Sequence, residues 1–147
     1  MSKAQEAKQL FESGANCAQA VMGAFAAECG IDRETALRMA SGFGGGVGRM
    51  REVCGAVSGM VMAAGLMRGN ADLDDKTAKD RDYALIQKLA GRFREETGSI
   101  VCRELLGLAP RQEDPPVSEE RTPKYYKKRP CGELVALAAA ILEEELS

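Results

Sequence analysis

The sequence contains no histidine and no tryptophan among its 147 residues, and aromatic residues make up only 5% of it. Without histidine, the chain cannot use Ser-His or Cys-His catalysis, histidine metal ligands or the usual side-chain proton shuttle at neutral pH. A metal site would have to use thiolates, carboxylates or backbone groups. Few aromatic rings are present to stack on bases, and the net charge of -2 argues against nonspecific attraction to nucleic acid or anionic lipid. We therefore expect no nucleic-acid partner.

The chain also lacks a long apolar run. The longest one, LVALAAAIL at Leu134–Leu142, is about half the length of a membrane span. The N-terminal segment MSKAQEAKQLFES is amphipathic and has no apolar block of the kind found in signal peptides. These features predict a soluble, cytoplasmic protein without a membrane span.

The apolar residues that are present recur at helical spacing, and no convincing alternating strand pattern is found. The pattern predicts an all-α fold, a single helical domain over residues 1–147 with about six or seven helices. Asn16, Asp32 and Ser99 are predicted N-caps. All five prolines lie within residues 107–130, which predicts an irregular surface loop before the last helix. The predicted helices cover residues 3–13, 17–29, 33–41, 51–66, 75–97, 100–106 and 130–146.

The five cysteines are an odd number in a chain without an export signal, which argues against structural disulfides and favours free, ligating or redox-active thiols. Four of them lie at or near predicted helix starts: Cys17, Cys54, Cys102 and Cys131. The unpaired N–H groups and the dipole of a helix start favour a thiolate. Basic residues nearby act in the same direction: Arg49, Arg51, Arg103 and Arg129. If the four helix starts converge, they would form a pocket suited to a thiolate cluster.

Cys29 differs from the other four. It lies at the C-terminal end of the predicted helix 17–29, about 18 Å from Cys17 along an unbroken helix. It continues an apolar stripe, so we expect an ordinary core residue. The sequence has no CxxC pair, and any site must be assembled by tertiary structure. Core packing of all five cysteines therefore stays open at this point.

Four segments of the sequence together resemble the C_GCAxxG_C_C family of redox-active proteins. The resemblance extends over nearly the whole chain, and the CGAxxG core with three outlying cysteines is specific as a set. The matching segments are NCAQAV at Asn16–Val21, CGAVSGMVMAAGL at Cys54–Leu66, CRELLG at Cys102–Gly107 and CGELVALAAAIL at Cys131–Leu142.

The resemblance implies a small cytoplasmic redox-active protein with four characteristic cysteines. These map onto Cys17, Cys54, Cys102 and Cys131, and Cys29 lies outside the pattern. A related domain in a multihaem cytochrome is associated with an iron–sulfur cluster. The resemblance therefore points to an iron–sulfur cofactor on these four residues, with zinc as the alternative metal.

Small residues follow Cys54 on the predicted fourth helix. Gly55, Ala56 and Gly59 are candidate cofactor-binding residues, because a backbone without bulky side chains can approach a sulfur or a cluster and offer N–H donors to it. Close helix–helix packing would explain the same residues. The loop GFGGGVG at Gly42–Gly48 lacks the spacing, the preceding strand and the Lys-Ser/Thr ending of nucleotide-binding loops. We expect no nucleotide cofactor and interpret the loop as a flexible hinge or lid beside Cys54.

Three functions are compatible with these residues. In the first, the four cysteines bind an iron–sulfur cluster for electron transfer or redox sensing, or less favourably a structural zinc ion. In the second, Cys54 attacks and forms a disulfide with one of Cys17, Cys102 and Cys131. In the third, a non-enzymatic helical interaction module buries its cysteines in the core. The first two need a redox partner protein, and the apolar stripes would also allow a homodimer.

Overall fold

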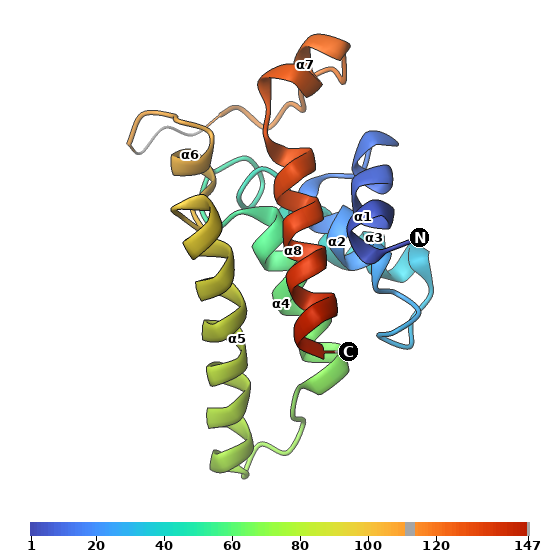
Figure 1. The fold of residues 1–147 in the computed structure, drawn as a ribbon, viewed down its shortest axis with the longest axis vertical. Coiled ribbons are helices and arrows are strands. Elements are labelled where there is room, and N and C mark those ends of the chain that lie inside the picture. Colours follow the sequence, from blue (N-terminus) through green and yellow to red (C-terminus); the bar gives the residue numbers. More distant parts are fainter. Residues whose placement is uncertain (111–113, 147) are drawn as a thin grey trace.

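A computed structural model describes residues 1–110 and 114–146, which form eight α-helices and one short 3-10 helix without a β-strand (Figure 1). The elements in chain order are α1 (Lys3–Glu12), α2 (Cys17–Ala24), α3 (Arg33–Ala40), η1 (Ser41–Phe43), α4 (Gly55–Arg68), α5 (Lys76–Thr97), α6 (Cys102–Leu105), α7 (Pro123–Lys128) and α8 (Cys131–Leu146). The all-α prediction is confirmed. No helix within these described ranges combines the length and the apolar character needed to cross a membrane.

Side-chain caps set several helix starts where the sequence predicted them. Asn16 accepts a hydrogen bond from the backbone N–H of Gln19, whose side chain bonds back to the Asn16 N–H. Asp32 and Asp75 cap α3 and α5, where each carboxylate accepts a hydrogen bond from the backbone N–H three residues later. These caps satisfy N–H groups that have no partner within the helix. The start of the chain's helices is therefore determined largely by local chemistry.

Other predicted boundaries are wrong. Helix α2 ends at Ala24 rather than at residue 29, because the N–H groups of Phe25 and Ala26 bond three residues back and the chain turns. The first turn of α6 follows Val101, and Ser99 is not its N-cap. The start of α4 lies after Cys54, four residues later than predicted.

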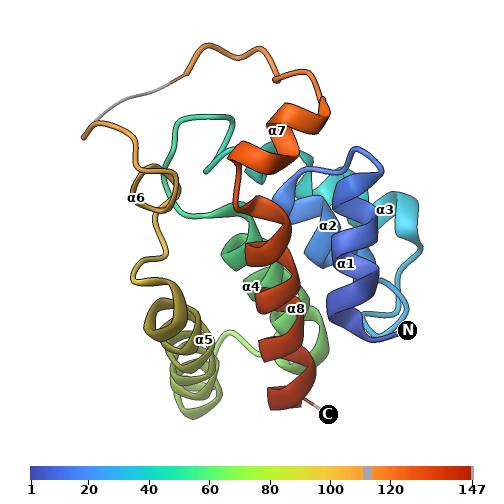
Figure 2. The same ribbon diagram turned by 45° about the horizontal axis from the view of Figure 1, so that its top comes forward.

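The segment 107–130 also differs from the predicted irregular loop, since it contains helix α7. Thr122 caps α7 with its hydroxyl, and Pro123 occupies its first turn, a position where the missing proline N–H costs no helical hydrogen bond. Residues 111–113 of this segment lie outside the described residues. Figure 2 shows residues 114–122 running across one end of the molecule to α7, which is followed by α8.

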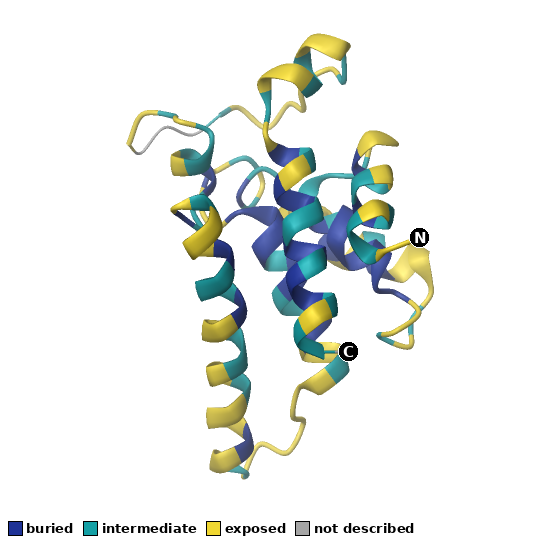
Figure 3. Ribbon diagram, in the orientation of Figure 1, coloured by how far each residue is buried: buried dark blue, intermediate teal, exposed yellow. Residues whose placement is uncertain are grey.

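The core lies where α2, α4 and α8 meet, with α1 and α3 packed on one side and the long α5 on the other (Figure 3). Helices α4 and α8 run in the same direction: both begin at cysteines, and Arg68 at the end of α4 donates a hydrogen bond to the carbonyl of Leu146 at the end of α8. Met22, Met60 and Phe93 are among the largest fully buried side chains of this core. The parallel course of α4 and α8 brings their N-termini to one end of the molecule.

Candidate functional site

Four cysteines line one cavity of about 420 Å³ at that end of the molecule: Cys17, Cys54, Cys102 and Cys131. Cys17, Cys102 and Cys131 are the first residues of α2, α6 and α8, and Cys54 is the N-cap of α4. The four helix starts therefore border one cavity. Cys29 lies in the turn after α2, where its thiol donates to the carbonyl of Ala63, 3.6 Å from the sulfur, and it is absent from the described lining of the cavity.

A short backbone pairing places Cys54 and Cys102 side by side. Val53 and Val101 form an isolated antiparallel bridge. On either side of it, the Cys54 N–H donates to the carbonyl of Ile100 at 2.8 Å, and the Cys102 N–H donates to the carbonyl of Glu52 at 2.6 Å. Helices α4 and α6 therefore begin next to each other although their sequences are nearly fifty residues apart.

Two glycines bring α4 against α2, and with it Cys54 toward Cys17. A Cβ added at Gly55 would lie 3.1 Å from both the Cys17 Cβ and the Ala18 nitrogen, and a Cβ at Gly59 would lie 2.7 Å from the Ala18 carbonyl oxygen. Helix–helix packing therefore accounts for Gly59. Gly55 serves this packing and also lines the cavity.

Backbone N–H groups at the start of α4 act on the Cys54 thiol. The N–H groups of Ala56 and Val57 lower its pKa, against the effect of burial, although Cys54 makes no side-chain capping hydrogen bond. Ala56 itself is fully buried. The assignment of Gly55, Ala56 and Gly59 to cofactor binding stays a prediction, and only the first two lie beside the sulfurs.

The glycine-rich loop forms a wall of the cavity in a hydrogen-bonded conformation, and its expected role as a flexible hinge or lid stays a prediction. Five consecutive residues from Gly45 to Arg49, and then Arg51, have φ between +56° and +69°. The N–H groups of Gly48, Arg51 and Glu52 each donate to a carbonyl six residues earlier. A Cβ at Gly46 would lie 2.6 Å from the Cys102 Cβ, so only glycine lets the loop approach this cysteine so closely.

Residues 114–129, here called the covering segment, lie over the loop and close the cavity with charged side chains. The guanidinium of Arg51 binds Asp114, with its Nε 2.8 Å from the carboxylate Oδ2, and Arg49 binds the same carboxylate and the carbonyl of Pro115. Within the segment, Arg129 pairs with Glu119. The ion pairs of Arg49 and Arg51 with Asp114 join parts of the chain that are more than sixty residues apart.

A further arginine of the covering segment anchors its second half. Arg121 donates to the carbonyls of Phe11 and Ala15 at 2.9 and 3.0 Å, and its guanidinium stacks 4.4 Å from the centre of the Phe11 ring. Sequence reasoning missed Arg121, Asp114 and Glu119. They stand among many other charges in a proline-rich stretch, and no local spacing marks them.

Burial opposes the thiolate-favouring effect of the helix starts. It raises the pKa of Cys54 to about 12, although the N–H groups of Ala56 and Val57 act in the opposite direction. Burial also raises the pKa of Cys102 against the lowering effect of Arg51. The expected lowering of the pKa at helix starts is therefore wrong for these two cysteines, because desolvation of the charged form outweighs the local field.

Cys17 and Cys131 behave as a pair. Hydrogen bonding by the Cys17 thiol lowers the pKa of Cys131, and the positive charges of Arg129, Arg51 and Arg121 lower it further. The same interaction and burial raise the pKa of Cys17 well above its usual value. Cys131 is thus the residue of this group that most readily carries a negative charge. Cys54 was the expected attacking thiol, and that role stays untested.

The cysteines are all free thiols in this structure. Within residues 1–110 and 114–146, no group of three or more Cys, Asp or Glu side chains is arranged to hold a single metal ion. The cavity thus offers four sulfur atoms, backbone N–H donors and buried positive charge. Of its four cysteines, only Cys131 has a lowered pKa, and the cavity is larger than one ion requires.

The comparison with protein families matches residues 15–145 to the family described as "Putative redox-active protein (C_GCAxxG_C_C)". The match includes all four cavity cysteines and the helices that carry them. Neither the curated proteins nor the solved structures give a match.

Proposed function

The chain belongs to the C_GCAxxG_C_C family of redox-active proteins, and on this premise we propose that its four cavity cysteines hold an iron–sulfur cluster for electron transfer or redox sensing. One observation carries the proposal: Cys17, Cys54, Cys102 and Cys131, from four separate helices, line one cavity. Four cysteine thiolates are the usual protein ligands of such clusters.

The donor set and the room fit a cluster better than a single ion. A tetrahedral zinc site requires each sulfur to lie about 2.3 Å from one point, and the described side chains would have to move to meet that requirement. A cluster distributes its ligands over several iron atoms. The cavity of about 420 Å³ also exceeds what one ion fills, since a water molecule occupies roughly 30 Å³ in the liquid.

The charge around the cavity supports the same proposal. Four arginines line it, and three of them, Arg49, Arg51 and Arg129, contact the carboxylates of Asp114 or Glu119. Four guanidinium groups against two carboxylates leave an excess of positive charge beside the sulfurs. This excess offsets the negative charge of the thiolate ligands, which would otherwise be costly to bury.

When bound, the cluster would supply one-electron redox chemistry. The chain's own residues would hold and tune it. The four thiolates would bind the iron, the backbone N–H groups of Ala56 and Val57 would favour negative charge on the Cys54 sulfur, and Arg51 donates to the Cys102 sulfur. Hydrogen bonds and positive charge at the sulfurs favour the reduced state and raise the reduction potential.

The test is iron and acid-labile sulfide analysis of the full chain purified without oxygen, with the visible absorption spectrum recorded. We expect colour, iron and sulfide in the wild type and their loss on replacing any one of the four cysteines by serine. Cys29→Ser is the matched control and should keep all three. A colourless, metal-free wild type with native helicity would contradict the proposal.

A second candidate function rests on the Cys17–Cys131 pair. The Cys17 thiol interacts with Cys131, whose pKa is lowered by that contact and by nearby arginines, which is the property of an attacking thiolate. The Cys131 thiolate would attack a disulfide of a partner protein. The Cys17 sulfur would then displace the partner, leaving a Cys17–Cys131 disulfide and a reduced partner dithiol.

Differential alkylation with and without reductant, read by mass spectrometry, tests this alternative. A Cys17–Cys131 crosslink after mild oxidation supports it. Full alkylation of both residues after the same treatment would count against it. Because the cluster proposal is tested in reduced, oxygen-free protein, the two results can be told apart.

A further inference from the structure

Arg51 is a buried charged residue at the centre of the cavity wall, with an exposed fraction of only 5%. Its Nη1 donates to the Cys102 sulfur at 3.6 Å, and its Nε and Nη2 donate to the carboxylate of Asp114. One guanidinium therefore contacts both a cavity cysteine and the covering segment. A planar group with several fixed donors can make both contacts at once, whereas a lysine offers a single charged centre.

The backbone around Arg51 is held in place by the pairing of two distant segments. Arg51 has a left-handed φ of +62°, a conformation that costs a residue with a side chain free energy unless its surroundings maintain it. Its N–H donates to the carbonyl of Gly45, and its own carbonyl accepts hydrogen bonds from the Arg103 backbone and side chain. The strained conformation aims the side chain between Cys102 and Asp114.

We propose that Arg51 is a positioning residue of the cavity: anchored by Asp114, its guanidinium holds the Cys102 sulfur in the cavity wall, and the same ion pair fastens the covering segment over the sulfurs. This inference deepens the proposed function. Its test by reduction potential rests on that function, whereas its test by cysteine labelling needs no metal.

Arg49 provides the matched control. It lies on the same loop with the same left-handed backbone, and its side chain binds Asp114, Glu119 and the carbonyls of Pro115 and Val117. All these described contacts lie in the covering segment. Arg49→Gln should loosen the cover and leave the Arg51–Cys102 contact in place.

The metal-free measurement compares two maleimides, one small and one carrying a pyrene group, on the reduced full chain. Peptide mass spectrometry gives the labelling rate at each cysteine. Both reagents react with the thiolate, so the ratio of the bulky to the small rate cancels the thiolate fraction and reports access alone. The variants are Arg51→Gln and Arg51→Gly; the second removes the side chain and relieves the left-handed backbone, so it guards against a failure to fold.

Arg49→Gln should raise the ratio of the bulky to the small labelling rate at Cys102 and at Cys131 by similar factors, because a loosened covering segment admits the bulky reagent to both cysteines. Both Arg51 variants should raise the ratio at Cys102 above that at Cys131 by about tenfold, which corresponds to roughly 1.4 kcal/mol. A parallel rise at the two cysteines, equal to that of Arg49→Gln, would overturn the positioning role. An unchanged ratio in all variants would overturn both parts of the proposal.

The second measurement is the reduction midpoint potential of the iron-loaded protein. Arg51→Gln should have a lower potential than Arg49→Gln, because it loses an N–H donor to a ligand sulfur as well as a positive charge. Equal potentials in the two variants would contradict the proposal that the Arg51 guanidinium positions the Cys102 sulfur. If the wild type binds no iron, the cluster proposal fails by itself, and the maleimide ratios still decide the role of Arg51.

Discussion

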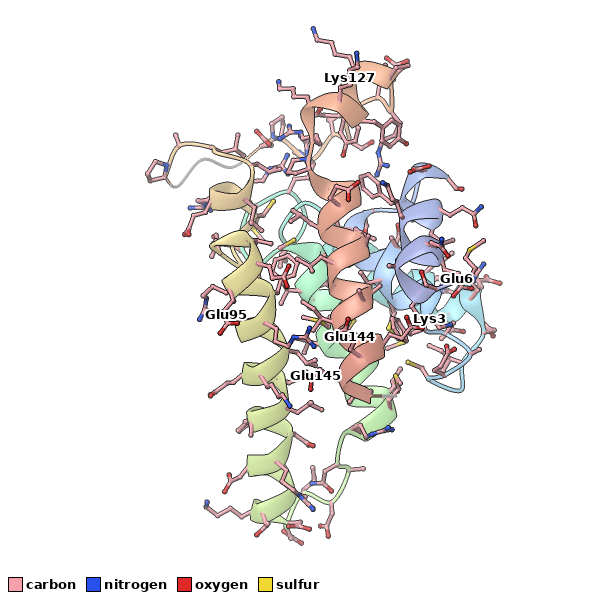
Figure 4. All side chains as sticks on the ribbon, viewed as in Figure 1. Lys3, Glu6, Glu95, Lys127, Glu144 and Glu145 are labelled. Atoms are coloured by element: carbon pink, nitrogen blue, oxygen red, sulfur yellow. The ribbon has the colours of Figure 1, made fainter. Side chains whose placement is uncertain are left out.

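The two ends of the parallel helices α4 and α8 are built in different ways. Where these helices begin, Arg51 is buried and glycines pack against other backbone segments. Where they end, the charges form partly exposed ion pairs. Glu144 and Glu145 project from α8 beside α5 (Figure 4) and pair with Arg92, and a Cβ at Gly65 would meet nothing within 4 Å.

This difference indicates that the two ends serve different purposes. At the cavity end, left-handed backbone and buried ion pairs each cost free energy, and the surrounding packed contacts hold them in place around the four cysteines. At the opposite end, amphipathic helices carry partly exposed ion pairs that each contribute little to stability. Substitutions of the same chemical kind should therefore have unequal effects at the two ends.

The largest effect is expected in the glycine loop. A Cβ at Gly46 would lie 2.6 Å from the Cys102 Cβ and 2.7 Å from the Glu52 nitrogen, and φ is +69°. Gly46→Ala should lower the free energy of unfolding by about 2 to 5 kcal/mol through strain and overpacking. Gly48→Ala, at φ +56° with open space around it, should lose only about 1–2 kcal/mol. Urea unfolding measures both, and equal losses would contradict the close contact with Cys102.

The next effect compares two glycines of α4. Gly59→Ala would place a Cβ 2.7 Å from the backbone oxygen of Ala18 and should destabilise the protein by about 1–3 kcal/mol. Gly65→Ala, on the exposed part of the same helix, should stabilise it by about 0.5–1 kcal/mol, because alanine favours the helix. The two urea midpoints should move in opposite directions. A stabilised Gly59→Ala would show that α2 and α4 are not in tight contact.

A pH effect follows from the buried Cys54, whose pKa is raised to about 12. At pH values below about 8.5, Cys54 is protonated in both the folded and the unfolded state, so its whole contribution to the free energy of unfolding is present. As the pH rises further, the unfolded state loses the proton first, and stability falls by about 1.4 kcal/mol per pH unit until about pH 12.

Cys54→Ala removes this titration, so its unfolding free energy should fall less steeply than that of the wild type in alkaline urea titrations. At pH 9.5 the two curves should have converged by about 1.4 kcal/mol relative to pH 7. Curves that stay parallel through this range would show that Cys54 ionises in the folded state as readily as in the unfolded state.

The smallest effect is expected at the opposite end. Arg92→Gln removes ion pairs to Glu144 and Glu145, which are screened by solvent and by salt. It should shift the thermal midpoint least of all these variants and leave the maleimide ratios at the cavity cysteines unchanged. The shift should shrink further in high salt. A change in cysteine access would mean that the two ends are coupled and do not behave independently.

Local signals explain which parts of the fold could be predicted. Asn16, Asp32 and Asp75 cap the helices that their sequence positions indicated. Helix α7 carried a comparable signal in Thr122 and Pro123, but the charged, proline-rich surroundings obscured it. The end of α2 at Ala24 had no such signal. The apolar stripe continues beyond it, and the chain turns so that α3 can pack on α2.

The sequence predicted which cysteines belong to the site, but it did not predict which groups surround them. The helix starts separated Cys17, Cys54, Cys102 and Cys131 from Cys29. The contact between Cys17 and Cys131, the hold of Arg51 on Cys102 and the anchoring of Arg51 by Asp114 each join residues that are fifty or more positions apart. No local pattern encodes which distant charge will meet which sulfur.

The sequence by itself determined the helical period, most helix starts and the distinction between four cysteines and the fifth. Apolar spacing and capping side chains act within a few residues, so they can be recognised along the chain. Only the tertiary structure decided that the four cysteines line one cavity, that burial outweighs the helix-start field at Cys54, and that residues 114–129 cover the sulfurs. Desolvation and ion pairing depend on what packs around a group, and those neighbours come from distant parts of the chain.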